Sequence, residues 1–254
     1  MIARVAFVRP VSPSLAKCEL TFVERAPIDV GRAAAQHAAY CRALAETGAE
    51  VIYMAPEPDL PDAVFVEDTA VALGEIIVVT RPGSRTRQDE IITAASTLSA
   101  HRPVSLIREP GTLDGGDVLR IGRDLFVGAT ARTNREGFDQ LAAIASRLGL
   151  RATAVPVHGS LHLKTAVTAL DDGALIMKGG SVDRATFAAY ELIDADPAEP
   201  EGANVINVNG RVLVAASAPR TRDLIARRGY EVVSVDISEF EKAEAGLTCL
   251  SILA

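Results

Sequence analysis

The chain has 254 residues, and 48% of them are hydrophobic, enough to bury a sizeable core. A formal net charge of −7 disfavours a nucleic-acid interface or an anionic membrane surface, so we expect neither as a partner. The sequence has no run of about 18 apolar residues that would span a membrane, and its first residues lack a signal-peptide pattern. The 3 cysteines have no paired spacing, which indicates reduced thiols and a cytoplasmic protein.

A strand, a tight turn, a second strand, a helix and a third strand follow one another repeatedly along the chain. Hairpins are expected over residues 68–79, 117–127, 164–177 and 204–214. Helices, recognised by apolar residues at helical spacing, are expected over residues 30–47, 87–100, 134–148 and 219–228. Further strands are expected over residues 104–107, 152–155 and 231–235. The chain is therefore predicted to consist of repeated ββαβ units.

The unit that contains the N-terminal strand is split. Residues 4–9 and the first helix begin it, and its missing strand is predicted at residues 249–253. The turns recur at roughly the 35 to 50 residues that are typical of arrays and propellers. We predict an α/β fold, a five-bladed pseudo-symmetric α/β propeller of ββαβ repeats, forming a single domain over residues 1–254. An ordinary α/β sheet is the alternative.

One cysteine and one histidine are candidates for covalent chemistry. Cys249 follows a glycine and small polar residues, whereas Cys18 and Cys41 fit a loop and an alanine-rich helix. His162 is a natural base for such a thiol, although a packed core thiol and a hydrogen-bonded core histidine are the simpler explanations of the two residues taken alone. His158 lies four residues before His162, but the intervening Gly-Ser break disfavours a helical zinc site.

Acidic residues recur where apolar runs would be expected to continue, and two of them flank a pair of glycines. They are Asp62, Glu67, Asp68, Asp114 and Asp117. Solvated turn residues would explain any single one of them, but their recurrence at the same place in successive repeats favours a shared role. A planar guanidinium with five N–H donors is a cation that several carboxylates can hold together.

Six segments in order carry a resemblance to a known family. They are Leu-Pro-Asp-Ala-Val-Phe-Val-Glu-Asp at 60–68, Thr-Arg-Pro-Gly at 80–83, Leu-Asp-Gly-Gly-Asp-Val-Leu at 113–119, Arg-Thr-Asn at 132–134, Leu-His-Leu-Lys at 161–164 and Leu-Thr-Cys at 247–249. From Arg9 to Leu253 the sequence resembles dimethylarginine dimethylaminohydrolase, of the guanidino-group-modifying enzymes that share the five-bladed pentein fold.

The resemblance implies roles for the residues that react. Cys249 would be the nucleophile and His162 the general acid/base, with Asp114 orienting His162. Position 114 is aspartate, which some relatives share and others replace with glutamate. Glu67 and Asp68 would hold the substrate guanidinium.

The resemblance also implies roles at the amino-acid end of a substrate. Asp62 would bind the α-ammonium, and Arg132 together with Arg87 would bind the α-carboxylate. Arg85 lies close enough in the sequence to compete with Arg87 for this assignment. Two further residues complete the predicted binding site: Leu20 on a lid loop and Ala243 through its backbone.

The implied reaction hydrolyses methylated arginines to citrulline and a methylamine through a covalent intermediate on Cys249, with no metal or organic cofactor. The expected partner is a small guanidino amino acid, and the protein is expected to be a monomer or a homodimer. Three alternatives remain: an arginine-deiminase-like hydrolase of guanidino or ureido compounds, an amidinotransferase, and a non-catalytic pentein-fold binding protein.

Overall fold

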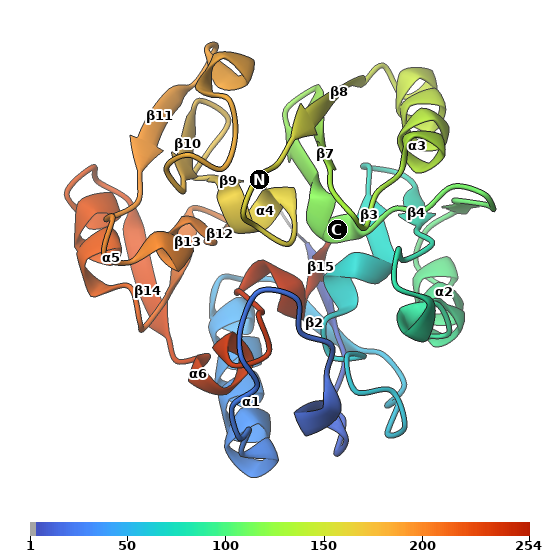
Figure 1. Ribbon diagram of the computed structural model, residues 1–254, viewed down its shortest axis with the longest axis horizontal. Helices are drawn as coiled ribbons and strands as arrows, with labels where there is room; N and C mark the ends of the chain where they lie inside the picture. Colours follow the sequence, from blue (N-terminus) through green and yellow to red (C-terminus); the bar gives the residue numbers. More distant parts are fainter. Residues whose placement is uncertain (1–3) are drawn as a thin grey trace.

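The computed structural model describes residues 4–254, and within them five three-stranded sheets are arranged in a ring (Figure 1). In every sheet the middle strand pairs antiparallel with the inner strand and parallel with the outer one. From inner to outer strand, the sheets are β15 (Ile252–Leu253), β1 (Val5–Val8), β2 (Glu50–Tyr53); β3 (Ala70–Ala72), β4 (Ile77–Val79), β5 (Val104–Leu106); β6 (Val118–Ile121), β7 (Asp124–Ala129), β8 (Arg151–Pro156); β9 (Val167–Ala169), β10 (Ala174–Met177), β11 (Glu191–Asp194); and β12 (Ile206–Val208), β13 (Arg211–Ala215), β14 (Glu231–Val235). The predicted five-bladed propeller is confirmed.

The split unit closes the ring as the sequence predicted. Ala6 of β1 lies opposite Leu253 of β15, and Phe7 lies opposite Ile252, in an antiparallel pair. The predicted strand at residues 249–253 is shorter than expected, because Cys249 belongs to a helical turn, Thr248–Leu250, that precedes β15.

Helices connect the middle strand to the outer strand in four units and lie on the outside of the ring (Figure 1). They are α1 (Val30–Glu46), α2 (Glu90–Ser99), α3 (Arg135–Arg147) and α5 (Pro219–Ala226). Asn134 caps α3 by accepting a hydrogen bond from the Gly137 amide at 2.8 Å. The helix predicted over residues 87–100 starts later, at Glu90, because Arg87 belongs to a preceding 3₁₀ turn. In the remaining unit the connection contains only a 3₁₀ turn, Arg184–Phe187.

A short helical turn leads into each inner strand, where the sequence predicted uninterrupted strands. The turns are Val66–Thr69, Gly115–Asp117, α4 (Leu163–Ala166), Pro200–Ala203 and Thr248–Leu250. Each turn brings its chain to the middle of the ring before the strand begins, so side chains from sequence-distant units meet there.

The apolar core lies between sheets and helices, as in the unit around α3. Leu141 and Ala145 of α3 pack with Val127 of β7 in one buried cluster. The inner strands instead line a central channel of about 550 Å³. No helix within residues 4–254 is long and apolar enough to cross a membrane.

Candidate active site

Four of the helical turns bring the predicted reacting residues together near the ring axis. Asp68 comes from the turn before β3, Asp114 from the residue before the β6 turn, His162 from the residue before α4, and Cys249 from the turn before β15. Asp68, His162 and Cys249 line a small cavity of about 30 Å³ together with Asp62, Arg87, Arg132 and Ala243. The ring therefore gathers most of the predicted site around one cavity.

His162 is held by Asp114. Its Nε2 lies 2.9 Å from Asp114 Oδ2 and 3.8 Å from Asp68 Oδ1, and the other Asp114 oxygen accepts the Gly83 amide at 2.8 Å. Burial lowers the pKa of the His162 imidazole, but the charge of Asp68 and the hydrogen bond to Asp114 outweigh it and raise the pKa to about 9. His162 is therefore an imidazolium at neutral pH.

Asp117 anchors the start of the helix that carries His162. Its carboxylate accepts the Leu163 amide at 3.0 Å and the hydroxyls of Thr130 and Thr133 at 2.6 Å each. Burial raises the pKa of Asp117 to about 6 despite the charge of His162 and these hydroxyls. The sequence marked Asp117 only as a recurring carboxylate, and the structure gives it this positioning contact.

Arg87 and Asp68 form a buried ion pair at one wall of the cavity. Arg87 Nη1 lies 2.5 Å from Asp68 Oδ2, and its Nε and Nη2 donate to the Glu90 carboxylate at 3.0 and 2.8 Å. Burial raises the pKa of Asp68, but the charges of His162 and Arg87 outweigh it and lower the pKa to about 2. Arg85, the competing candidate, is exposed and does not line the cavity.

Two consecutive glycines allow these turns to approach each other. A β-carbon on Gly116 would lie 2.6 Å from His162 Nδ1 and 2.8 Å from Asp68 Oδ1. A β-carbon on Gly115 would overlap the Glu67 carbonyl oxygen. The Gly116 amide donates to Asp68 Oδ1 at 3.0 Å, which only a residue without a side chain permits at this separation.

Cys249 is partly exposed, whereas Cys18 and Cys41 are buried. Burial of the thiol and the charges of Glu67 and Asp68 raise the pKa of Cys249 to about 12. In the unliganded protein this thiol is thus protonated at neutral pH. A cation placed beside it would lower the pKa again.

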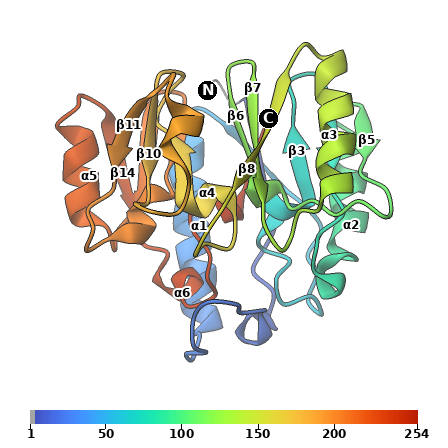
Figure 2. The same ribbon diagram turned by 45° about the horizontal axis from the view of Figure 1, so that its top comes forward.

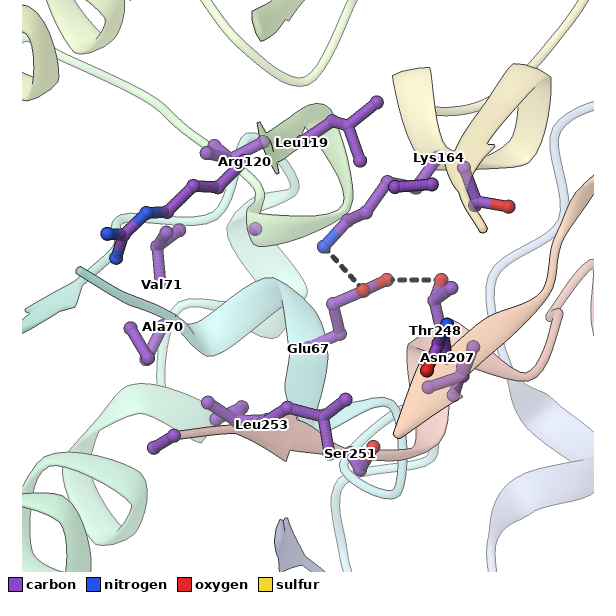
Figure 3. Close-up of a pocket in the computed structure, with 18 of the residues that line it drawn as sticks. Glu67, Ala70, Val71, Leu119, Arg120, Lys164, Asn207, Thr248, Ser251 and Leu253 are labelled. Carbon is purple, nitrogen blue, oxygen red and sulfur yellow. Dashed lines mark hydrogen bonds and ion pairs between the residues drawn. The ribbon is translucent and has the colours of Figure 1, made fainter. Parts of the chain in front are cut away.

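Glu67 faces the central channel and is not among the residues that line the small cavity. Its carboxylate pairs with Lys164 Nζ at 2.5 Å and accepts the Thr248 hydroxyl at 2.8 Å (Figure 3). Asp68 and Cys249 directly follow Glu67 and Thr248 and line the cavity on the other side. At these two turns, consecutive residues therefore face opposite sides: Glu67 and Thr248 line the channel, and Asp68 and Cys249 line the cavity.

Asn204 fixes the turn that carries the thiol, and no sequence motif pointed to it. Its Oδ1 accepts the Thr248 amide at 3.0 Å, while its Nδ2 donates to the Thr248 hydroxyl and to the Lys164 carbonyl. The only signal in the sequence is that a polar residue begins this repeat, where the other units place reacting groups.

The end of the cavity remote from Cys249 is formed by loops. Arg132 lies between β7 and α3, and its Nη2 pairs with Glu19 Oε2 at 3.2 Å. Asp62 accepts the Glu19 amide at 3.2 Å, and burial raises the pKa of its carboxyl. Leu20, the predicted lid residue, is not among the residues that line this cavity and packs against the apolar core, while its neighbour Glu19 lines the cavity.

Glu244 holds the loop that carries Glu19. Its carboxylate accepts the amides of Thr21 at 2.7 Å and Val23 at 2.6 Å, and also that of Phe22. Glu244 has a left-handed backbone with φ of 59°, directly after Ala243. This loop lies on the same side of the ring as α6 (Ser238–Glu241) in Figure 2.

The structure does not place His158 beside His162. His158 is exposed, and His162 lies instead with Asp68 and Asp114, the three ligand atoms being within 4.8 Å of one another. The exposed position of His158 gives no support to a zinc site formed by these two histidines.

Comparison with known proteins agrees with this geometry. A family model described as arginine deiminase matches residues 57–199. Dimethylarginine dimethylaminohydrolase of Streptomyces coelicolor is 44% identical, covering 99% of this chain and 97% of that one. The chain belongs to the dimethylarginine dimethylaminohydrolase family.

Solved structures of relatives have the same fold. The Pseudomonas aeruginosa dimethylarginine dimethylaminohydrolase, a cysteine-to-serine variant complexed with citrulline, superposes with a TM-score of 0.96 at 34% identity, and each chain is fully covered (100%). The N-terminal domain of ArgZ, an arginine dihydrolase of cyanobacteria, is similar in fold in a C-to-S variant bound to substrate. The TM-score is 0.85 at 20% identity, covering 98% of this chain and 97% of that domain.

Proposed function

We propose that this protein hydrolyses Nω-methylated arginines to citrulline and a methylamine through a covalent intermediate on Cys249. The observation that carries the proposal is one cavity bordered by a thiol, a cationic histidine and an ionised aspartate, in a member of this family. This combination offers a nucleophile, an acid and a guanidinium partner.

Binding would prepare the nucleophile. The substrate guanidinium lies against Asp68, whose carboxylate remains ionised because its pKa is about 2. The same positive charge next to Cys249 offsets the negative charges that raise the thiol pKa to about 12, so the thiolate forms when substrate is present. Carboxylates in the guanidinium plane also orient the carbon towards sulfur.

The two chemical steps share His162. Cys249 sulfur attacks the guanidinium carbon, His162 donates its proton to the methylated nitrogen, and the carbon–nitrogen bond breaks to release the methylamine. The neutral imidazole then takes a proton from water, whose oxygen attacks the S-alkylthiouronium carbon. The carbon–sulfur bond breaks, citrulline forms and Cys249 is restored.

Other residues bind the amino-acid end or support the turns. Arg132 and Arg87 bind the α-carboxylate, although Arg87 already pairs with Asp68 and Glu90. Asp62 binds the α-ammonium, the backbone at Ala243 helps to bind the amino-acid end, and Leu20 belongs to the lid loop. Glu67 lies on the channel side of the site, paired with Lys164, and would stabilise the substrate guanidinium from that side through its negative charge.

A cytoplasmic location is part of the proposal, because the chemistry needs a reduced Cys249 and the cysteines are unpaired. A second candidate reaction, deimination of arginine itself, is favoured by the arginine deiminase family model that matches residues 57–199. Both reactions give citrulline, so the released amine distinguishes them.

Product analysis tests the proposal. Arginine, monomethylarginine and asymmetric dimethylarginine are supplied separately, and citrulline, ammonia, methylamine and dimethylamine are quantified. We expect dimethylamine and citrulline in equal amounts from asymmetric dimethylarginine, with arginine turned over far more slowly. Preferred release of ammonia from arginine would assign the deiminase reaction instead.

A further inference from the structure

Glu19 pairs with the guanidinium of Arg132, to which the proposed function assigns the substrate α-carboxylate. Its Oε2 lies 3.2 Å from Arg132 Nη2, and its Oε1 accepts the Ser84 hydroxyl at 2.6 Å and also that of Thr86. Burial raises the pKa of Glu19, but these hydroxyls and the charges of Arg132 and Arg87 outweigh it and lower the pKa. The side chain is therefore a carboxylate at neutral pH.

The contact with Glu19 satisfies only one of the two terminal nitrogens of Arg132. Its Nη1 is buried and has no hydrogen-bond partner among residues 4–254, although a guanidinium commonly pairs with a carboxylate through two parallel bonds. Glu19 provides one contact to Nη2 and none to Nη1. A carboxylate that enters the cavity can therefore make a pair that Glu19 leaves incomplete.

The cavity is too small to hold both the Glu19 carboxylate and a substrate carboxylate. About 30 Å³ accommodates one or two water molecules, not an amino acid. The segment that carries Glu19 must move when a substrate enters. Leu20 packs against the apolar core, whereas residues 21–23 are exposed and are held by polar contacts. Phe22 on this segment is 59% exposed, and the Glu244 carboxylate is what fastens residues 21–23. Such a segment opens at low cost.

We propose that Glu19 is a specificity-determining residue whose carboxylate substitutes for the substrate α-carboxylate on Arg132 until the substrate displaces it. This inference depends on the proposed function, because it takes Arg132 as the α-carboxylate site. Every α-amino acid substrate must then compete with a tethered carboxylate, and its apparent affinity is reduced by the fraction of molecules in which Glu19 is bound. A guanidine without a carboxylate cannot displace Glu19 from Arg132.

The competition is measured with Glu19→Gln, which keeps the size of the side chain and removes its charge. Glu24→Gln is the matched control, since Glu24 is exposed on the same loop. We expect KM for asymmetric dimethylarginine to fall about 3- to 30-fold in Glu19→Gln, the effect of losing a partly exposed charge-assisted pair, with kcat changed less than about twofold. Glu24→Gln should leave both constants unchanged.

Two further measurements identify Arg132 as the residue for which the carboxylates compete. Citrulline binding is measured by calorimetry in a Cys249→Ser background, with and without Glu19→Gln, which removes any dependence on turnover. The gain in citrulline affinity should match the fall in KM. This gain in affinity should disappear when Arg132→Ala is added, because the cation for which Glu19 and citrulline compete is then absent.

An unchanged or higher KM in Glu19→Gln, or a gain that persists in Arg132→Ala, overturns the inference. If citrulline binds the wild-type site and Glu19→Gln has no effect, only the inference fails. If neither citrulline nor methylarginines bind, the proposed function fails and the inference fails with it.

Discussion

The two ends of the cavity are built in different ways. The reacting end is formed by the turns that precede the inner strands. Its residues Asp114, Asp68 and His162 are at most 3% exposed. The amino-acid end stands on loops, where the Glu19 side chain is 32% exposed and one Arg132 nitrogen has no partner in the described chain. Bond breaking needs fixed distances, which the ring supplies, whereas substrate entry needs groups that can exchange partners.

Replacing the nucleophile Cys249 should have the largest effect on kcat. It tests whether catalysis depends on the thiol at the reacting end. Cys249→Ser is expected to lower kcat by at least about 10⁴-fold, because a hydroxyl lacks thiolate reactivity, while the fold stays intact. Circular dichroism and steady-state kinetics measure both. Cys18→Ser and Cys41→Ser are the controls and should keep most activity per folded molecule. A Cys249→Ser enzyme within about tenfold of wild type would contradict covalent catalysis.

Asp114→Asn tests how strongly the reacting end depends on the orientation and charge of His162. We expect kcat to fall on the order of 10²-fold or more. Because Asp114 helps to raise the pKa of His162 to about 9, the acid form should persist to about pH 9 in wild type and be lost at lower pH in the variant. The alkaline limb of the pH–kcat profile measures this shift. An unshifted limb would show that Asp114 does not control the proton on His162.

Arg132→Ala tests the amino-acid end. KM for asymmetric dimethylarginine should rise roughly 10- to 1000-fold for the loss of a charge-assisted pair, with a smaller fall in kcat from looser positioning. Guanidines without an α-carboxylate, such as agmatine, should be poor substrates of wild type and little affected by the substitution. A wild-type preference for agmatine, or an unchanged KM for methylarginine in the variant, would refute the α-carboxylate role.

Metal removal should have the smallest effect. Extensive chelation is expected to leave kcat and KM unchanged, since the proposed steps use only protein groups and water. Added zinc should inhibit, because Asp68, Asp114 and His162 offer three ligand atoms close to a thiol. Activity that chelation abolishes and stoichiometric metal restores would overturn the metal-free mechanism.

The sequence predicted the repeats well because hairpins, crossover helices and their turns have local patterns. It also predicted that residues at the start of each repeat converge, since carboxylates recur there. It missed Asn204, which makes its contacts to Thr248 and Lys164 across 44 and 40 residues of sequence. It could not tell that Glu19 rather than Leu20 lines the cavity, because a loop has no periodicity that determines which side chain turns inward.

The pairing of β1 with β15 has a consequence for the order of folding. Joining Phe7 to Ile252 closes a loop of almost the whole chain, and contacts between residues so distant in sequence form late. Cys249 lies on the turn that enters β15, so its sulfur reaches the other reacting groups only after that closure. During refolding, helical signal should therefore return before catalytic activity, and the interval between them reports the rate at which the ring closes.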